Sequence, residues 1–299
     1  MRLLLTGAFK ATEEQLNNIR SLGYELVFMQ DERGDIPCAC EEIEGVICDG
    51  LFFYHDINKF SVLKFIQLTS AGFDRVPMDE AKRRGIKVFN ARGVYSIPMA
   101  EYAVWGVLSL YKRGRFFENN RNQKKWEKHR SIPELFGKTV GIIGCGNVGY
   151  ECAIRFKAFG ANILGVDLIE RVDDVFGQVH SIERIDDALR KADIVVLTLP
   201  LTENTKGLFD ENRFFAMKNG SILVNISRGA IVEEKALLKG LKEKLFGAVL
   251  DVFESEPLNE KSELWNLENV ILTPHNSFVG EGNGERLSKV VIKNLEGIK

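Results

Sequence analysis

Short apolar runs alternate with segments of helical spacing along the chain. In the first hundred residues, five such runs predict β-strands: Arg2–Thr6, Tyr24–Phe28, Gly45–Cys48, Lys64–Thr69 and Ile86–Phe89. Between the first two runs, the residues from Thr12 to Leu22 predict a helix, because Thr12 and Gln15 form a capping-box pattern and Gly23 favours a stop. Strands that alternate with helices are typical of a parallel α/β architecture. We therefore expect one small doubly wound sheet in this part of the chain.

A second series of apolar runs predicts six further strands: Thr139–Ile143, Asn162–Val166, Ile194–Leu199, Ser221–Ile226, Phe246–Leu250 and Val270–Leu272. Six strands in sequence fit a complete Rossmann sheet. Between the two series, Pro98 starts a segment that is apolar on nearly every side up to Tyr111, which predicts a buried helix. The basic segment from Lys112 to Arg130 is expected to be a solvated linker. Residues 281–299 are expected to form a helix that returns to the first series.

The composition is that of a globular protein with two domains. The chain has 299 residues, of which 45% are hydrophobic and 27% charged, and its formal net charge is -2. This charge argues against a nucleic-acid partner, and no apolar stretch reaches the roughly 18 residues of a membrane span. The N-terminus lacks the pattern of a signal peptide, and five cysteines, an odd number, indicate reduced thiols. We expect a cytoplasmic protein without a metal site, since Cys38 and Cys40 lack a second ligand pair.

A glycine-rich turn directly follows the first strand of the second series and precedes a predicted helix. Gly144, Gly146 and Gly149 form the pattern G-x-G-x-x-G. The first glycine permits a tight turn, the second permits the approach of a pyrophosphate, and the third permits close packing of helix on strand. Asn147 and Val148 begin the helix, whose peptide N–H groups and positive dipole end favour phosphate. These features together predict a dinucleotide site.

An acidic residue stands at the end of the next strand. Asp167 is in the position where a carboxylate accepts hydrogen bonds from both ribose hydroxyls of a dinucleotide. The same carboxylate would repel a 2′-phosphate, so the sequence favours NAD over NADP. Arg171 is close enough in sequence to leave NADP as the alternative.

Three charged or titratable residues follow later strands of the second series. They are Arg228, Glu256 and His275. Open α/β sheets place their ligand crevice at the carboxyl ends of the strands. We therefore expect these three side chains to lie at the ligand crevice.

The residues at these positions resemble the D-isomer-specific 2-hydroxyacid dehydrogenase family. The matching segments are Leu135 to Gly144, Leu199 to Thr205, Ser227 to Gly229, Asp251 to Pro257 and Thr273 to His275. They occur in the family's order, and the match spans most of the chain. The resemblance implies a flavodoxin-like substrate domain, residues 1–97 plus 276–299, with a Rossmann NAD-binding domain, residues 98–275, inserted in it. It also implies a homodimer formed through the helix after Pro98.

The resemblance implies hydride transfer between NAD and C2 of a small D-2-hydroxy or 2-oxo acid. His275 is then the general acid/base, Glu256 its hydrogen-bond partner, and Arg228 the group that binds the substrate carboxylate and polarises its carbonyl. Asp251 is expected to accept from the nicotinamide carboxamide. The other expected cofactor contacts are Leu199, Pro200, Thr205, Ile226 and Ser227, with Arg228 and His275. The backbone N–H groups expected to hold the substrate carboxylate are those of Ser70, Ala71 and Gly72.

One alternative belongs to another functional class. An NAD(H)-responsive binding protein of the same fold, similar to the transcriptional co-repressors, would associate with a partner but turn over no 2-oxo acid. A formate-dehydrogenase-like activity is disfavoured, because Glu256 stands where that branch carries an amide. Residues 276–284 depart from the family pattern, which leaves the edge of the substrate pocket open.

Overall fold

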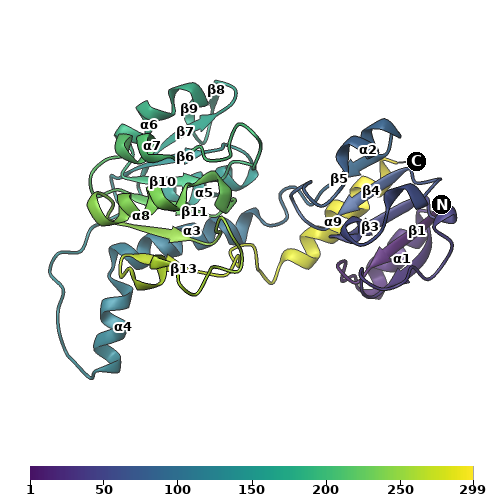
Figure 1. Ribbon diagram of the computed structural model, residues 1–299, viewed down its shortest axis with the longest axis horizontal. Helices are drawn as coiled ribbons and strands as arrows, with labels where there is room; N and C mark the ends of the chain where they lie inside the picture. Colours follow the sequence, from purple (N-terminus) through teal and green to yellow (C-terminus); the bar gives the residue numbers. More distant parts are fainter. Residues whose placement is uncertain (299) are drawn as a thin grey trace. The chain divides into compact units, whose positions relative to one another are not determined.

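The computed structural model describes residues 1–298. The chain forms two compact units (Figure 1). Unit 1 comprises Met1–Tyr95 and Gly280–Lys299, and unit 2 comprises Ser96–Val279. The expected boundaries, after residue 97 and before residue 276, lie close to these. Each unit contains a largely parallel sheet with helices on both faces, so the predicted α/β class is confirmed.

Unit 1 has a five-stranded parallel sheet in the order β2-β1-β3-β4-β5. Its strands are β1 (Arg2–Thr6), β2 (Glu25–Met29), β3 (Gly45–Cys48), β4 (Phe65–Leu68) and β5 (Lys87–Phe89). This is the flavodoxin-like order. Each predicted strand lies within one residue of the observed one at both ends. The side chains of β1, β3 and β4 are nearly all buried, whereas β2 and β5 at the two edges of the sheet are largely exposed or half-buried.

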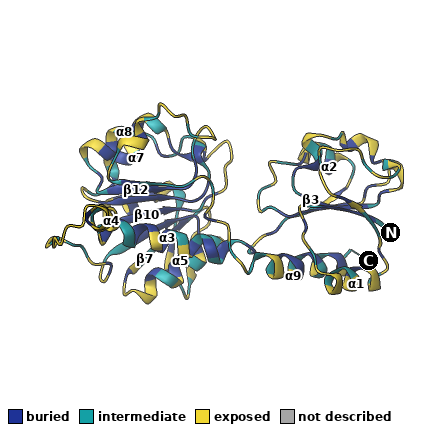
Figure 2. Ribbon diagram, turned by 90° about the horizontal axis from the view of Figure 1, so that it is seen from below, coloured by how far each residue is buried: buried dark blue, intermediate teal, exposed yellow. Residues whose placement is uncertain are grey.

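Helices cover both faces of the unit 1 sheet (Figure 2). α1 (Glu13–Ser21) and α9 (Asn283–Glu296) lie on one face, and α2 (Met78–Arg83) lies on the other. The predicted capping box is present, since Thr12 and Gln15 exchange side-chain-to-backbone hydrogen bonds at the start of α1. Three short 3-10 turns complete the unit: η1 (Cys40–Glu42), η2 (Leu51–Phe53) and η3 (Ile57–Lys59).

The C-terminal helix α9 is bonded to the unit 1 sheet by polar as well as apolar contacts. Val291 and Leu295 are buried in a cluster with residues of β1 and α1. Asn294 Nδ2 donates to Oε1 of the fully buried Gln67 in β4 at 2.8 Å, and the Tyr24 hydroxyl donates to Leu295 O at 3.0 Å. The helix expected from the sequence therefore forms part of the unit 1 core.

At the carboxyl end of the unit 1 sheet, one carboxylate joins the loops that follow three strands. Glu32 accepts hydrogen bonds from Thr6 Oγ1 at 2.6 Å, from Asp49 N at 2.7 Å and from Gly50 N at 2.6 Å. Thr6 ends β1, while Asp49 and Gly50 follow β3. The Glu32 side chain thus links the end of β1 to the loop after β3, on the two sides of the point where the strand order reverses.

Unit 2 has an eight-stranded sheet in the order β13-β12-β11-β10-β6-β7-β9-β8. Its strands are β6 (Thr139–Ile143), β7 (Asn162–Asp167), β8 (Arg171–Asp173), β9 (Gly177–Ser181), β10 (Ile194–Leu197), β11 (Ile222–Asn225), β12 (Gly247–Leu250) and β13 (Val270–Leu272). All neighbours pair in parallel except β8 with β9. The order reverses between β6 and β10, which places a ligand crevice at their carboxyl ends.

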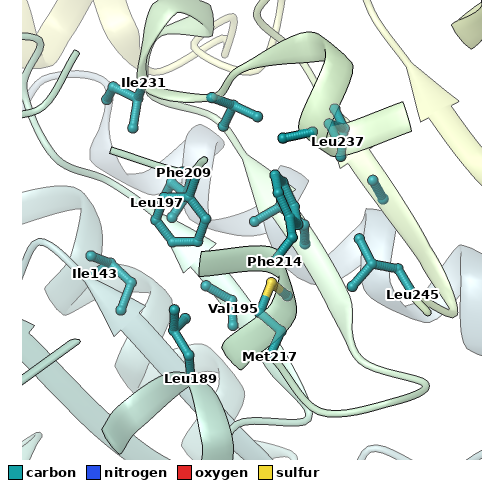
Figure 3. Close-up of a cluster of buried hydrophobic side chains, with 14 of the residues drawn as sticks. Ile143, Leu189, Val195, Leu197, Phe209, Phe214, Met217, Ile231, Leu237 and Leu245 are labelled. Atoms are coloured by element: carbon teal, nitrogen blue, oxygen red, sulfur yellow. The ribbon is translucent and has the colours of Figure 1, made fainter. Parts of the chain in front are cut away.

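Two hydrophobic clusters cover the two faces of this sheet. On one face lie α6 (Ile185–Lys191), α7 (Glu211–Ala216) and α8 (Glu234–Glu243); on the other lie α3 (Ser96–Tyr111) and α5 (Asn147–Ala158). Figure 3 shows Leu197 of β10 beside Phe209, with Phe214 and Leu237 packed from the helices of the first face. The remaining 3-10 turns are η4 (Ile182–Arg184), η5 (Gly229–Ile231) and η6 (Glu263–Asn266).

Two segments of unit 2 differ from the sequence prediction. The sheet has eight strands rather than six, because the hairpin of β8 and β9 extends it. Both strands are short and largely polar, so they lack an apolar run. The expected linker from Lys112 to Arg130 contains a helix, α4 (Gly114–Asn122), whose side chains are nearly all at least partly exposed.

The helix α3 is buried as predicted, with Pro98 in its first turn. Its buried residues include Ala100, Ala103 and Val107, whereas Trp105 is 49% exposed. Despite this apolar character, no helix among residues 1–298 has the length and hydropathy needed to cross a membrane.

We expect Asn294→Ala to lower the free energy of unfolding by about 1–3 kcal/mol, because the buried Gln67 Oε1 would lose its donor. Urea unfolding followed by circular dichroism would measure the change. Lys293→Ala, at an exposed position of the same helix, should stay within about 0.5 kcal/mol of the unaltered chain. Equal effects of the two substitutions would contradict this role of Asn294.

Candidate functional site

The glycine-rich turn connects β6 to α5, and two of its glycines are required by close contacts. Gly144 has φ +103°, and a Cβ there would lie 2.8 Å from Leu199 N. A Cβ on Gly149 would lie 2.1 Å from Gly144 O, so this glycine lets α5 pack directly on the turn. Thr198 Oγ1 donates to Gly144 O at 2.5 Å and closes the turn from β10.

The middle glycine borders open space. No atom lies within 4 Å of a Cβ built on Gly146, which is the N-cap of α5. The first N–H groups of a helix have no acceptor within the helix and carry its positive dipole end. The segment that starts at Asn147 and Val148 therefore fits a phosphate group, and Gly146 leaves room for it. This chain can hold the pyrophosphate of a dinucleotide here.

Asp167 lies at the end of β7 beside the glycine turn. Its Oδ1 accepts from Leu168 N at 2.8 Å, and its Oδ2 accepts from Cys145 N at 3.2 Å and from Arg171 Nη1 at 3.3 Å. Arg171 Nη2 also donates to Cys145 O at 2.9 Å. The Asp167 side chain is 25% exposed, so solvent and solutes can reach it.

Cys145 fills a buried space inside this turn. Its thiol lies 3.5 Å from Val166 O, and a Cβ on Gly165 would lie 2.8 Å from Cys145 Sγ. Burial, with a smaller contribution from the Asp167 carboxylate, raises the pKa of the Cys145 thiol to about 12. The thiol is therefore neutral and fills space in the turn.

The loops after β10 and β11 meet at the carboxyl edge of the sheet. Leu199 and Ile226 are buried, and the Ser227 hydroxyl donates to Leu199 O. Thr205 turns its hydroxyl inward, where it donates to Pro200 O at 2.7 Å. The loops after β10 and β11 thus carry five of the expected cofactor contacts: Leu199, Pro200, Thr205, Ile226 and Ser227.

Arg228 follows β11 in extended backbone and is partly buried. Its Nη1 donates to Ser227 O at 2.9 Å, and Asn225 Nδ2 donates to Arg228 O at 3.2 Å. A Cβ on Gly229 would lie 1.8 Å from Phe253 C, so the turn is in direct backbone contact with the loop after β12. This contact brings Arg228 next to the loop that carries Glu256.

His275 and Glu256 form a hydrogen-bonded pair. His275 Nδ1 lies 2.8 Å from Glu256 Oε2, and Glu256 Oε1 accepts from Phe253 N at 3.0 Å. The His275 and Glu256 side chains are 39% and 37% exposed. One ring nitrogen is therefore engaged by the carboxylate, while the imidazole remains accessible to a solute.

The backbone of His275 is held in an uncommon conformation by a buried carboxylate. His275 has φ +52°, in the left-handed region. Asp251 is fully buried, and it accepts from Thr273 Oγ1 at 2.6 Å, from Asn276 N at 2.7 Å and from Ser277 N at 2.8 Å. His275 N donates to Asp251 O at 2.7 Å. Asp251 thus fixes the residues on both sides of His275.

Tyr102 of α3 extends this network and was not among the predicted site residues. Its hydroxyl and Thr273 Oγ1 share a hydrogen bond. Burial raises the pKa of Tyr102 to about 12, so the phenol stays protonated and donates to the threonine, which donates in turn to Asp251. The two residues are 171 positions apart, and no sequence pattern links them.

The predicted carboxylate-binding loop of unit 1 follows β4. Ser70 O accepts from Ala91 N at 2.9 Å, and Asn90 Nδ2 donates to Ala71 O at 2.5 Å. Ser70 Oγ is buried and has no hydrogen-bond partner in the part of the chain that the structure describes. The loop's carbonyl groups are thus engaged by residues 90 and 91, and a buried hydroxyl is left without an acceptor.

Comparison with known proteins gives consistent matches. A family model described as "D-isomer specific 2-hydroxyacid dehydrogenase, NAD binding domain" matches residues 104–277. The glyoxylate reductase of Thermofilum pendens is 37% identical over 241 residues, covering 78% of this chain and 71% of that protein. The crystal structure of a D-isomer specific 2-hydroxyacid dehydrogenase family protein from Aeromonas salmonicida superposes with a TM-score of 0.82 at 30% identity, covering 98% of this chain and 94% of that one.

A third similar protein was crystallised with ligands. It is the D-lactate dehydrogenase from Aquifex aeolicus, complexed with NAD and lactic acid. Its TM-score is 0.78 at 26% identity, with coverage of 99% of this chain and 94% of that chain.

The packing of the glycine turn predicts opposite outcomes for two alanine substitutions. Gly149→Ala should destabilise unit 2 by about 1–3 kcal/mol, because its Cβ would overlap Gly144 O. Gly146→Ala should leave stability nearly unchanged, since its Cβ meets no atom. Thermal unfolding of both variants and of the unaltered chain would measure this. A Gly149→Ala protein as stable as Gly146→Ala would show that the turn is looser than described.

Proposed function

The chain belongs to the D-isomer specific 2-hydroxyacid dehydrogenase family and is an NAD-dependent oxidoreductase, and from this premise we propose a reaction and a role for each site residue. The reaction is hydride transfer between nicotinamide and C2 of a small D-2-hydroxy acid or its 2-oxo form. The main support for these roles is the hydrogen bond between His275 and Glu256 at the carboxyl edge of the unit 2 sheet.

His275 is the general acid/base of this proposal. With Nδ1–H donated to Glu256, the other ring nitrogen is the one that exchanges a proton with the substrate oxygen. In reduction, imidazolium gives its proton to the carbonyl oxygen as C2 receives hydride; in oxidation, neutral imidazole takes the proton from the hydroxyl. Glu256 stabilises the imidazolium and fixes the ring, and Phe253 N in turn fixes Glu256.

Arg228 binds the substrate carboxylate. A guanidinium is permanently charged and offers a planar pair of donors that matches a carboxylate. In the same proposal, the backbone N–H groups of Ser70, Ala71 and Gly72 hold the substrate carboxylate from unit 1.

The cofactor is NAD rather than NADP in this proposal. When bound, NAD supplies the hydride acceptor, and its reduced form the donor. The N-terminus of α5 and the space at Gly146 hold the pyrophosphate, and Asp167 accepts from the adenosine ribose. Leu199, Pro200, Thr205, Ile226 and Ser227 form the cofactor's contacts on the next two loops. Asp251 accepts from the carboxamide in addition to holding the His275 loop.

Replacing His275 with asparagine should lower kcat by about 10²- to 10⁴-fold and leave NADH binding largely intact, because the imidazole transfers the proton and is only one of many proposed contacts of the dinucleotide. Glu256→Gln should reduce kcat by a smaller factor. Glu254→Gln, an exposed carboxylate two positions away in the same loop, is the matched control and should be unaffected. NADH oxidation with glyoxylate, hydroxypyruvate, pyruvate, phosphohydroxypyruvate and branched 2-oxo acids measures turnover and identifies the substrate.

Two outcomes would contradict these roles. Retained turnover in His275→Asn would remove His275 as the acid/base. Failure of the unaltered chain to turn over any 2-oxo acid, together with NADH-dependent association with another protein, would favour a co-repressor-like binding protein instead.

We also propose that the protein is a cytoplasmic homodimer joined through α3. All five cysteines are free thiols, which fits a reducing compartment. Trp105 is 49% exposed on a helix that is largely buried, and Tyr150 and Ile154 of the neighbouring helix α5 are 42% and 40% exposed. Aromatic and aliphatic side chains of this kind are typical of the centre of an interface.

Trp105→Glu should therefore shift the protein from dimer to monomer, because a carboxylate cannot be buried unpaired at an apolar contact. Light scattering coupled to size-exclusion chromatography measures the mass. Trp265→Glu, at another half-exposed tryptophan of unit 2, serves as control and should stay dimeric. A monomeric unaltered chain would contradict the proposed assembly.

A further inference from the structure

Two glycine contacts define how helix α3 lies along strand β12. A Cβ on Gly106 would lie 2.5 Å from Val249 Cγ1, and a Cβ on Gly247 would lie 3.3 Å from Leu110 Cδ1. Four residues of a helix and two residues of a strand cover similar lengths, about 6 Å and about 7 Å. One turn before Gly106, the helix therefore brings Tyr102 to the carboxyl end of β12.

Tyr102 is the first donor in a directed chain of hydrogen bonds. Thr273 Oγ1 donates to Asp251 Oδ1 at 2.6 Å, because an ionised carboxylate accepts and does not donate. A hydroxyl has a single hydrogen, so the threonine oxygen is the acceptor in its bond with Tyr102. Burial raises the pKa of Tyr102 to about 12, which keeps this donor protonated near neutral pH. The Tyr102 hydroxyl thus holds the Thr273 side chain in the rotamer that reaches Asp251.

The Thr273 hydroxyl controls the backbone on the N-terminal side of His275. Of the donors to the Asp251 carboxylate within residues 1–298, it is the one that precedes the histidine, whereas two peptide N–H groups follow it. Pro274 stands between Thr273 and His275, and its fixed φ leaves few ways to absorb a shift. His275 itself is held at φ +52°, which is unfavourable for a residue with a side chain, so it relaxes when a constraint is lost.

We infer that Tyr102 is a positioning residue of the proposed reaction: its hydroxyl holds His275 in the backbone conformation that turns the imidazole towards Glu256. The effect passes through Thr273 and Asp251, so Tyr102 needs no contact with substrate or cofactor. The inference rests on the proposed function, in which the ring nitrogen not bonded to Glu256 exchanges the proton.

The Tyr102 ring has little freedom to move its hydroxyl. Its centroid lies 5.1 Å from that of Trp105, with the two ring planes at 51°. The ring also packs against the buried cluster between α3, α5 and the sheet. A donor confined in this way holds its acceptor at a fixed place, which is the property that a positioning group requires.

A purely structural role for Tyr102 makes a different prediction. Loss of one hydrogen bond of a half-buried hydroxyl would then lower the stability of unit 2 and leave the turnover of each folded molecule unchanged. A positioning role lowers kcat, while NADH binding changes little because nearly all of the proposed cofactor contacts lie on other loops. The value of kcat, rather than stability, therefore separates the two roles.

The first test compares Tyr102→Phe with Tyr111→Phe on the same helix. Burial also raises the pKa of Tyr111 to about 12, but its hydroxyl makes no hydrogen bond within the part of the chain that the structure describes. Tyr102→Phe should lower kcat about tenfold or more and change KM for the 2-oxo acid and Kd for NADH less than about threefold. Tyr111→Phe should keep kcat within about twofold of the unaltered chain. Urea unfolding followed by circular dichroism shows that both variants are folded.

The second test asks whether Tyr102 acts through Thr273. Thr273→Val removes the hydroxyl at nearly constant volume and should lower kcat at least as much as Tyr102→Phe. Once that hydroxyl is absent, Tyr102→Phe should have no further effect, so the double variant should stay within about twofold of Thr273→Val. Thr273→Ser keeps the hydroxyl and should retain a kcat at least about fivefold above that of Thr273→Val.

A third readout needs no turnover. Nuclear magnetic resonance of the full chain, labelled with ¹⁵N at its four histidines, reports which ring nitrogen carries the hydrogen, and His275→Asn identifies the His275 signals. At about pH 8, where an ordinary histidine is neutral, we expect one tautomer of His275, with its hydrogen on Nδ1. Tyr102→Phe should mix the two tautomers, and Tyr111→Phe should not.

Each other outcome overturns a defined statement. If Tyr102→Phe keeps either kcat or the single tautomer, Tyr102 does not position His275. If the effects of Tyr102→Phe and Thr273→Val multiply, or if Tyr111→Phe lowers kcat as much as Tyr102→Phe, the effect does not pass through Thr273 and the inference fails. If the unaltered chain turns over no 2-oxo acid, the proposed function fails, and the tautomer measurement alone then decides whether Tyr102 positions the histidine.

Discussion

The arrangement of the unit 2 site depends on the buried carboxylate of Asp251. A charged group without solvent contact needs hydrogen-bond donors, and three come from the segment that contains His275. This requirement fixes the backbone before and after the histidine and holds it in the left-handed region. The Tyr102 hydroxyl continues the network into α3. The orientation of the imidazole towards Glu256 is thus a consequence of satisfying one buried charge.

The rest of the site is positioned by close backbone contacts rather than by long side chains. Gly144, Gly149 and Gly229 each stand where any Cβ would overlap a neighbouring backbone atom. These contacts bring the loops after β6, β10, β11 and β12 together at one edge of the sheet. The sheet below is rigid, because both of its faces are covered by buried apolar clusters. The polar groups of the site therefore stand on loops that have little freedom to separate.

Much of this arrangement can be predicted from the sequence, and the exceptions have physical reasons. Buried strands such as β1, β3 and β6 appear as apolar runs, so their bounds match the prediction. The hairpin of β8 and β9 lies at the edge of the sheet, where polar side chains are tolerated, and no run marks it. Arg228, Glu256 and His275 could be proposed because each follows a strand. Tyr102 could not, because its contact with Thr273 depends on how α3 packs against the sheet.

The sheet of unit 1 also has a point where its strand order reverses, but there a side chain of the protein itself occupies the donors. Flavodoxin-like sheets bind ligands where the strand order reverses, outside the carboxyl ends of β1 and β3. At this point Glu32 already occupies the backbone donors of Asp49 and Gly50 and the hydroxyl of Thr6. A covalently tethered anion has a very high effective concentration, so a dissolved anion competes poorly with it. Unit 1 therefore carries a carboxylate of its own at the position where related folds hold an exchangeable ligand.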